Sequence, residues 1–292
     1  MTMANSRVRS FLLAPAYYAA ALALAILIIA SANDASRTYE SVSAHESVSA
    51  KTDRALRDAL ESLSLGLYGG GTEMAEQLAA AIGTAEFHEA RAVGAGWLLL
   101  GLSIAFLAAV ITMEDRARRA RSVVIIRHLF GVSGIFLMIG LLAPILTVVA
   151  HEEIALLGRV VLQYESKGII TTIHKLYLVK NFFLASLLLL FSVLLPVLKI
   201  LLSLIALELG HTRTRRTSVL LVKAIGRWSM TDVFVVAVLL AFLTADTAQL
   251  TDATLGPGLY FFAGYGLLSI AAGQLMIGYE GNSPPPSVAG GQ

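Results

Sequence analysis

The sequence contains no cysteine and few charged side chains. Without cysteine, the protein can form neither a disulfide bond, nor a thiolate nucleophile, nor a cysteine-based zinc site. Charged residues make up 14% of the 292 residues, against roughly 25% in a typical soluble domain. The formal net charge is only +2, so the chain lacks the strongly basic surface of a nucleic-acid-binding protein.

Apolar residues are abundant and are gathered into long runs. They account for 57% of the chain, and the mean hydropathy is +0.74. These values exclude a soluble globular enzyme and a disordered chain. The runs are about as long as the roughly 20 residues that cross a bilayer. We therefore expect an all-α polytopic membrane protein with six transmembrane helices, at Phe11–Ser31, Val93–Met113, Val123–Ala150, Lys180–Leu207, Thr231–Ala248 and Gly258–Ile277.

Basic residues indicate how these spans are oriented. Arginine and lysine are concentrated before the first span and in the connections after the second and the fourth. Because such residues favour the cytoplasmic side, we expect a multi-pass inner-membrane protein with both termini in the cytoplasm. Ala30-Ser31-Ala32 resembles a signal-peptide cleavage site, but the apolar run before it exceeds the 7–15 residues of a signal-peptide core. An uncleaved anchor is expected, and cleavage is the alternative.

The first part of the chain, residues 1–113, is expected to form a transmembrane hairpin. It encloses an extracytoplasmic segment, residues 32–92, in which apolar residues recur at helical spacing on both sides of Gly69-Gly70-Gly71. Thr72 is placed to cap the second of two helices there. Two amphipathic helices that pack together are expected, with a partner-binding helical surface as the alternative.

A four-span module is expected over residues 122–277, followed by a disordered tail at 278–292. Between the first two spans of the module, β-branched runs at 160–162 and 169–173 flank a turn signal at 165–168. We expect these runs to form a short extracytoplasmic β-hairpin that caps the four-helix module.

The motifs for catalysis or metal binding are weak. Gly131-Val132-Ser133-Gly134 resembles the serine motif of rhomboid intramembrane proteases, but the last three spans contain no histidine to accept the serine proton. Small residues that let helices approach closely explain this motif better. His151, Glu152, Glu153 and His174 match no known metal-site spacing. We expect no enzymatic activity, no metal and no cofactor.

Lys199 lies deep in the apolar fourth span, roughly 13 Å along the helix from Glu208. An ammonium group at such depth costs about 2.5–3.5 kcal/mol, so it should face the bundle interior or water. Snorkelling to the headgroups is the alternative. Asp232 is the expected counter-ion, and Pro196 should kink the helix and free a backbone carbonyl.

Asp246 is a further polar candidate near the outer end of the fifth span. Gly256-Pro257-Gly258 follows it and predicts a tight turn between antiparallel helices. The last span then opens with aromatic side chains, which usually lie at the membrane interface: Tyr260, Phe261, Phe262 and Tyr265.

Several of these features occur together in one known family. Pro196-Val197-Leu198-Lys199 is followed by Gly226-Arg227-Trp228-Ser229-Met230-Thr231-Asp232-Val233-Phe234-Val235-Val236, by Gly256-Pro257-Gly258 and by the aromatic-led last span. Over about residues 123–277 the chain resembles the paraquat-inducible protein A family of bacterial membrane proteins. The resemblance implies that the family's signature positions are Pro196, Lys199, Trp228, Ser229, Met230, Asp232 and Phe234.

The same resemblance implies a role in lipid trafficking across the envelope of diderm bacteria. Members of the family work in the inner membrane with MCE-domain proteins, whose periplasmic assemblies carry phospholipids between membranes. Better-known members have two four-span modules, each preceded by a cysteine-rich zinc ribbon. This chain has one module, no cysteine and an extra hairpin, so zinc is not carried over. The candidates for lipid binding or a polar core are Lys199, Asp232, Pro196, Trp228, Ser229 and Asp246.

Two other classes of function stay open. A scaffold or sensor could use the extracytoplasmic segment at 32–92, although the chain has no cytoplasmic output domain. A small-solute or proton-coupled transporter could use Lys199, Asp232 and Asp246, although the spans show no inverted repeat. The expected partners are membrane phospholipid and an MCE-domain periplasmic protein. A homodimer is left open, and no nucleic acid is expected.

Overall fold

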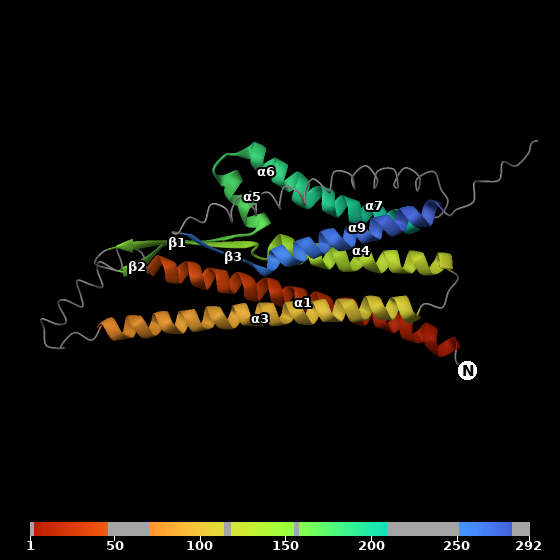
Figure 1. Ribbon diagram of the computed structural model, residues 1–292, viewed down its shortest axis with the longest axis horizontal. Helices are drawn as coiled ribbons and strands as arrows, with labels where there is room; N and C mark the ends of the chain where they lie inside the picture. Colours follow the sequence, from red (N-terminus) through yellow and green to blue (C-terminus); the bar gives the residue numbers. More distant parts are fainter. Residues whose placement is uncertain (1–2, 46–69, 114–117, 155–157, 209–250, 282–292) are drawn as a thin grey trace, which may run out of the picture.

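The computed structural model describes residues 3–45, 70–113, 118–154, 158–208 and 251–281 (Figure 1). Two long helices, α1 (Met3–His45) and α3 (Gly70–Met113), lie side by side and form the N-terminal hairpin. The remaining elements are α4 (Arg118–Leu142), β1 (Leu146–Ile154), β2 (Gly158–Lys167), α5 (Ile169–Leu178), α6 (Phe182–Leu188), the π-helix η1 (Leu189–Leu194), α7 (Leu195–Glu208), β3 (Thr251–Leu255) and α9 (Pro257–Gly281).

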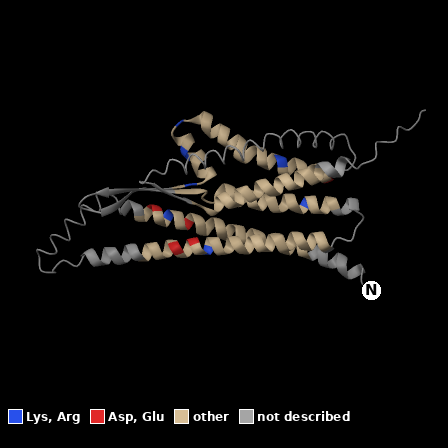
Figure 2. Ribbon diagram, in the orientation of Figure 1, with Lys and Arg blue, Asp and Glu red and all other residues tan. Residues whose placement is uncertain are grey.

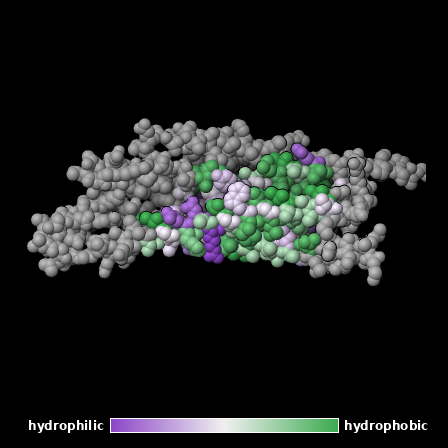
Figure 3. Space-filling view, turned by 60° about the horizontal axis from the view of Figure 1, so that its bottom comes forward, coloured by the Kyte–Doolittle hydropathy of each residue, from purple (hydrophilic) through white to green (hydrophobic). Residues whose placement is uncertain are grey.

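Five helices of the described chain are long and apolar enough to cross a membrane. They fall at five of the six expected spans, and the remaining one, Thr231–Ala248, lies outside the described residues. Apolar side chains gather over the middle of the face shown in Figure 3, and hydrophilic ones gather toward the end that carries the strands. The fold class is thereby confirmed as a helical, multi-pass membrane protein.

The two helices of the hairpin extend well beyond the expected spans. α1 continues past Ser31 to His45, and α3 is one uninterrupted helix from Gly70. The expected helix start at Thr72 is therefore wrong, because the helix already begins among the glycines. No proline interrupts the chain between that point and the apolar span, so the segment continues directly into it. The leucine-rich segment at 56–67 lies outside the described residues.

The third span is shorter than expected. α4 ends at Leu142, whereas the apolar run continues to Ala150. Pro144 follows the helix end closely and cannot donate an N–H to continue the helical ladder. The chain then becomes strand β1, which pairs with β2 and β3 in the order β2-β1-β3. Both pairings are antiparallel, and the β1–β2 ladder is irregular between Ala150 and His151.

The expected β-hairpin exists, but only one of the two predicted runs, 160–162, lies in one of its strands. Its strands are β1 and β2, and the run at 169–173 is the first half of helix α5. The Thr171 hydroxyl accepts from Gly168 N at 2.9 Å, and Thr172 donates to Gly168 O at 2.7 Å. The first of these bonds satisfies the N–H of Gly168, because the backbone donors at the start of a helix have no intrahelical partner. The spacing of Ile169 and Ile173, both turned toward the core, is helical and outweighs their strand propensity.

Gly256-Pro257-Gly258 joins strand β3 to helix α9, so the expectation of a turn between two helices is wrong. Gly256 N donates to Ile145 O at 2.8 Å, and Gly258 N donates to Pro144 O at 2.9 Å. A Cβ added at Gly258 would lie 2.5 Å from Ala143 O. Glycine is required because two stretches of backbone approach too closely for a side chain.

An aromatic node near one end of the bundle holds α1, α3 and α4 together. Tyr17 stacks on Phe106 at a ring distance of 4.0 Å, and Tyr18 Oη lies 3.1 Å from His128 Nδ1. The Tyr17 hydroxyl is 2.8 Å from Ser103 Oγ. Because Ser103 donates its own proton to Leu99 O, Tyr17 is the donor of this buried bond.

The strand end of the bundle also ties the hairpin to the rest of the molecule. Asn33 Nδ2 of α1 donates to Leu142 O at 3.2 Å. Ser166 Oγ of β2 donates to Ser36 Oγ at 3.1 Å. Together with the aromatic node, these contacts fix the hairpin against α4 and the sheet at both ends.

Candidate functional site

Lys199 is buried in the described structure, with only 4% of its surface exposed. It shares one side of the α6–η1–α7 segment with other buried residues spaced three, four or seven positions apart: Ala185, Ser192, Pro196, Ser203 and Ala206. Spacing of this kind forms a continuous stripe along one helix face. The face turns toward α4, where Gly134 lies against the Ile200 side chain. Lys199 thus points away from lipid, and its binding role stays a prediction.

The helix widens directly before Pro196. Residues Leu189–Leu194 adopt a π-helix, and α7 resumes at Leu195. Proline removes the N–H that would bond to the carbonyl of Ser192 and crowds that carbonyl. A local π-turn is a common way to absorb such a mismatch, and such turns often occur at functional sites. Ser192, inside the widened turn, is buried.

Four of the six predicted site residues lie outside the described residues: Trp228, Ser229, Asp232 and Asp246. Their predicted roles stay predictions. Among the described residues, no acidic group forms an ion pair with Lys199. Ser133 of the rhomboid-like motif is fully buried and donates to Phe130 O within its own helix at 2.9 Å. The flanking Gly131 and Gly134 face Tyr18 and Ile200 of neighbouring helices.

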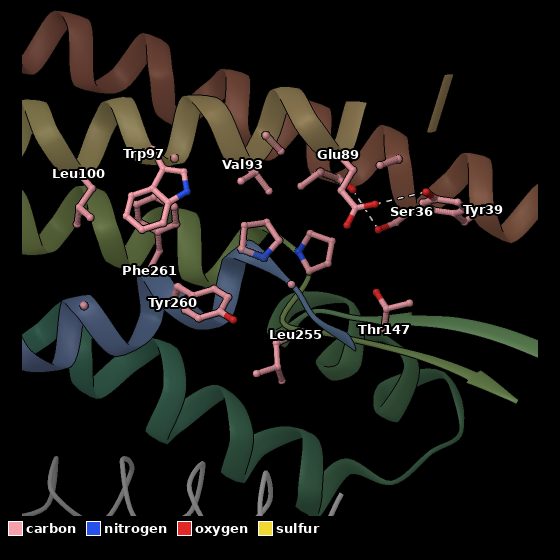
Figure 4. Close-up of a pocket in the computed structure, with 18 of the residues that line it drawn as sticks. Ser36, Tyr39, Glu89, Val93, Trp97, Leu100, Thr147, Leu255, Tyr260 and Phe261 are labelled. Carbon is pink, nitrogen blue, oxygen red and sulfur yellow. Dashed lines mark hydrogen bonds between the residues drawn. The ribbon is translucent and has the colours of Figure 1, made fainter. Parts of the chain in front are cut away.

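A second candidate site was not predicted. A cavity of about 920 Å³ lies between the N-terminal hairpin, the strands and the start of α9. We call it the hairpin cavity (Figure 4). Its volume is at the upper end of the range typical of small-molecule sites.

One end of the hairpin cavity is apolar and aromatic. Val93, Trp97 and Leu100 of α3 follow one another at helical spacing along its wall, and Phe261 of α9 lies opposite (Figure 4). Gly96 also lines this end, and a Cβ at this position would meet the Phe261 ring at an ordinary contact distance of 3.5 Å. This end lies within the apolar spans of α3 and α9.

The other end of the hairpin cavity is polar. Tyr39 Oη of α1 donates to Glu89 Oε2 of α3 at 3.3 Å, next to Ser36 and Thr147 (Figure 4). Charged residues of α1 and α3 gather at this level (Figure 2): Asp34, Arg37, Glu40, Glu86, Glu89 and Arg91. A band of charge beside apolar helices marks the edge of the hydrocarbon layer. The hairpin cavity therefore runs from an apolar end to an end beside this band of charge, which is where we expect the lipid headgroups.

Sequence reasoning missed this cavity because its walls come from distant segments. The charges that follow the first span and precede the second were visible, and antiparallel packing of a hairpin brings such positions together. The aromatic start of the last span was expected at the membrane interface, but of its four aromatic residues Tyr260 alone is exposed, at 64%, whereas Phe261, Phe262 and Tyr265 are buried in the core. The third wall depends on β3 and on the short third span, which the sequence did not indicate.

Comparison with known proteins gives one result. No curated protein and no solved structure matches the chain significantly. Residues 133–276 match the model of the family described as paraquat-inducible protein A. This segment holds the C-terminal part of α4 (133–142), the three strands, the Lys199 helix and most of α9, and it leaves out the N-terminal hairpin. This match supports the assignment of residues 133–276 to the paraquat-inducible protein A family.

Proposed function

We propose that this protein is an inner-membrane component of an intermembrane phospholipid transport system and works with an MCE-domain partner. Its termini then lie in the cytoplasm and the strands on the periplasmic side. The observation that carries the proposal is the hairpin cavity, which combines an apolar, aromatic end with a polar end. A phospholipid has the same division along its length.

Lys199 supplies a second polar position in this proposal. Its ammonium group is buried on the face of α7 that turns toward α4. A lysine can hold a phosphate as a point charge, so Lys199 is proposed to contact the phosphate of a lipid that moves through the module. Asp232, Trp228, Ser229 and Asp246 remain candidates for the same path.

The partner and the lipid are tested together. The tagged protein is purified from native membranes in mild detergent, and co-purifying proteins and phospholipids are identified by mass spectrometry. We expect an MCE-domain protein and a near-stoichiometric amount of phospholipid. Recovery of the intact protein with neither would overturn the proposal and direct attention to a scaffold or sensor role.

A matched pair of glycine variants links the lipid to the hairpin cavity. Gly96 lines the cavity, whereas Gly101 on the same helix has open space around it. Gly96→Leu should fill part of the cavity and lower the amount of co-purified phospholipid severalfold, while Gly101→Leu should leave it unchanged. Equal lipid in both variants would contradict a cavity-bound lipid.

A further inference from the structure

We propose that the hairpin cavity selects a phospholipid with a primary-amine headgroup, such as phosphatidylethanolamine, and that Glu89 binds the ammonium group. The inference rests on the proposed lipid-handling function and deepens it by naming the headgroup. Glu89 of α3 lies at the polar end of the cavity. The other charged residues in the same band of α1 and α3, such as Glu86 and Arg91, do not line the hairpin cavity.

Charge complementarity is the first argument for an amine. Among the described residues that line the hairpin cavity, Glu89 is the one with a charged side chain, and no lysine or arginine accompanies it. A carboxylate attracts an ammonium group and repels the net negative charge of phosphatidylglycerol. The neighbouring donor, Tyr39, holds one carboxylate oxygen at 3.3 Å, and this contact fixes the position of the negative charge.

The hydroxyl groups around Glu89 are the second argument. The Ser36 hydroxyl donates a hydrogen bond to Ala32 O at 3.0 Å, and its oxygen accepts a hydrogen bond from the Ser166 hydroxyl at 3.1 Å. Its oxygen has two lone pairs, so one stays available to accept from an ammonium group. A primary ammonium has three N–H donors, and the polar end offers it a carboxylate together with this serine oxygen.

The opposite wall suits the rest of the headgroup. Thr147 of β1 and Tyr260 of α9 place hydroxyl groups on the cavity wall across from α1 (Figure 4). Hydroxyl protons can bond a phosphodiester oxygen, which is the group that follows the amine in phosphatidylethanolamine. The Tyr260 ring belongs at the interface between hydrocarbon and water, as is usual for tyrosine.

The apolar end argues against a soluble amine or a protein lysine as the occupant. Val93, Trp97, Leu100 and Phe261 continue the cavity into the membrane-spanning part of the bundle. A small amine would leave this surface unfilled, whereas an acyl chain covers it and gains about 0.8 kcal/mol for each buried methylene group. The occupant is therefore an amphiphile with its amine at the Glu89 end.

Competition between lipids tests the headgroup directly. The delipidated, purified protein is equilibrated with vesicles of equimolar phosphatidylethanolamine, phosphatidylglycerol and phosphatidylcholine, and bound lipids are counted by native mass spectrometry. We expect phosphatidylethanolamine to exceed phosphatidylglycerol about three- to tenfold, as for one charge-assisted bond in a partly exposed site. Phosphatidylcholine should also bind more weakly, because its quaternary amine has no N–H donor.

Two matched pairs of variants locate the selectivity. Glu89→Gln should bring the ratio of bound phosphatidylethanolamine to bound phosphatidylglycerol close to one, with total bound lipid unchanged. Glu86→Gln, one turn away on α3 and outside the cavity lining, should keep the wild-type ratio.

The second pair tests the apolar end of the cavity. Trp97→Ala should lower the binding of all three lipids. Leu98→Ala, at a position that is 66% exposed and also outside the lining, should leave their binding unchanged.

The outcomes separate this inference from the proposed function. Wild-type protein that binds all three lipids equally would overturn the headgroup assignment and leave lipid handling standing. Wild-type protein that binds no lipid would overturn both. A Glu86→Gln effect equal to that of Glu89→Gln would also overturn the assignment. If Glu89→Gln does not fold, the headgroup assignment is tested by the ratios of the three lipids bound to the wild-type protein.

Discussion

At the scale of single residues, the most unusual feature is the buried ammonium group of Lys199. Its side chain is 4% exposed, and the Ser203 hydroxyl beside it already donates to the Lys199 carbonyl at 2.7 Å. A buried cation lowers the stability of a membrane helix unless it is paired or solvated. The residue therefore costs stability at a position where leucine or methionine would pack well.

Replacing Lys199 separates stability from activity. Lys199→Met keeps the length of the side chain and removes the charge, so we expect an unchanged or higher melting temperature in detergent. Phospholipid transfer between vesicles should fall about tenfold or more, as for the loss of a hydrogen bond to a charged group. Lys175→Met, on the exposed side of α5, is the control for both measurements. A variant that melts higher and transfers lipid normally would contradict a phosphate-binding role.

Lys199 could be predicted from the sequence, whereas Glu89 could not. Lysine inside a long leucine-rich run departs from its surroundings, and the energetic cost of that placement is known without a structure. Glu89 is one of several acidic residues near the hairpin's membrane boundary. Only the packing of α3 against α1 and α9 distinguishes it from Glu86, because that packing decides which carboxylate faces the hairpin cavity.

At the scale of secondary structure, the close contact between α4 and α9 depends on glycine. A Cβ at Gly140 of α4 would lie 2.8 Å from Phe262 Cα and N, and one at Gly264 of α9 would lie 2.8 Å from the Phe136 ring. At each of these two positions, a glycine of one helix lies against the other helix. The missing side chain lets the two backbones approach closely, and the helices pack tightly without a hydrophobic driving force.

Adding one methyl group to this contact should be harmful. We expect Gly140→Ala to lower the free energy of unfolding by about 1–3 kcal/mol, because the clash is with backbone and cannot be relieved by a rotamer change. Gly101→Ala adds the same group in open space on α3 and should be neutral or stabilising by up to about 1 kcal/mol. Unfolding in a graded mixture of mild and denaturing detergent measures both. Equal free energies of unfolding for the two variants would contradict this prediction.

The boundaries of helices and strands were predicted less well than the existence of the spans. Apolar run length locates a span, but it does not distinguish the last helical turn from the strand that follows it. Pro144 was the available signal for the end of α4, and the threonines after Gly168 were the signal for the start of α5. Strand β3 was not expected at all, because its formation depends on pairing with β1, more than 100 positions earlier.

At the scale of the whole molecule, the N-terminal hairpin is an integral wall of the bundle. It lies outside the segment that matches the family model, yet it contacts that segment at the strand end, through Leu142 and Ser166. Without the hairpin, the cavity would lose Glu89, Trp97 and Tyr39 together. The headgroup selectivity proposed above is therefore a property that this chain adds to the family module.

The attachment at the strand end can be tested by crosslinking. The chain has no cysteine, so a Ser36→Cys and Ser166→Cys pair is the sole thiol pair in the variant. These serine oxygens are 3.1 Å apart and 130 positions apart in sequence. Mild oxidation should form a disulfide that stabilises the fold by about 2–4 kcal/mol, detected by intact mass and thermal unfolding. Ser41→Cys with Ser166→Cys is the control, and equal crosslinking of both pairs would contradict the placement of α1.

The order of the elements along the chain also has a consequence for biogenesis. The helix that packs against Gly140 of α4 is α9, which begins at Pro257, whereas α4 ends at Leu142. At a synthesis rate of about 5–20 residues per second, the ribosome needs roughly 6–23 s to produce the intervening chain. During that interval α4 is already in the translocon or the bilayer with its tightest helix contact unmade. Nascent chains arrested before α9 should therefore present the uncovered Gly140 face of α4 to membrane chaperones and quality-control proteases.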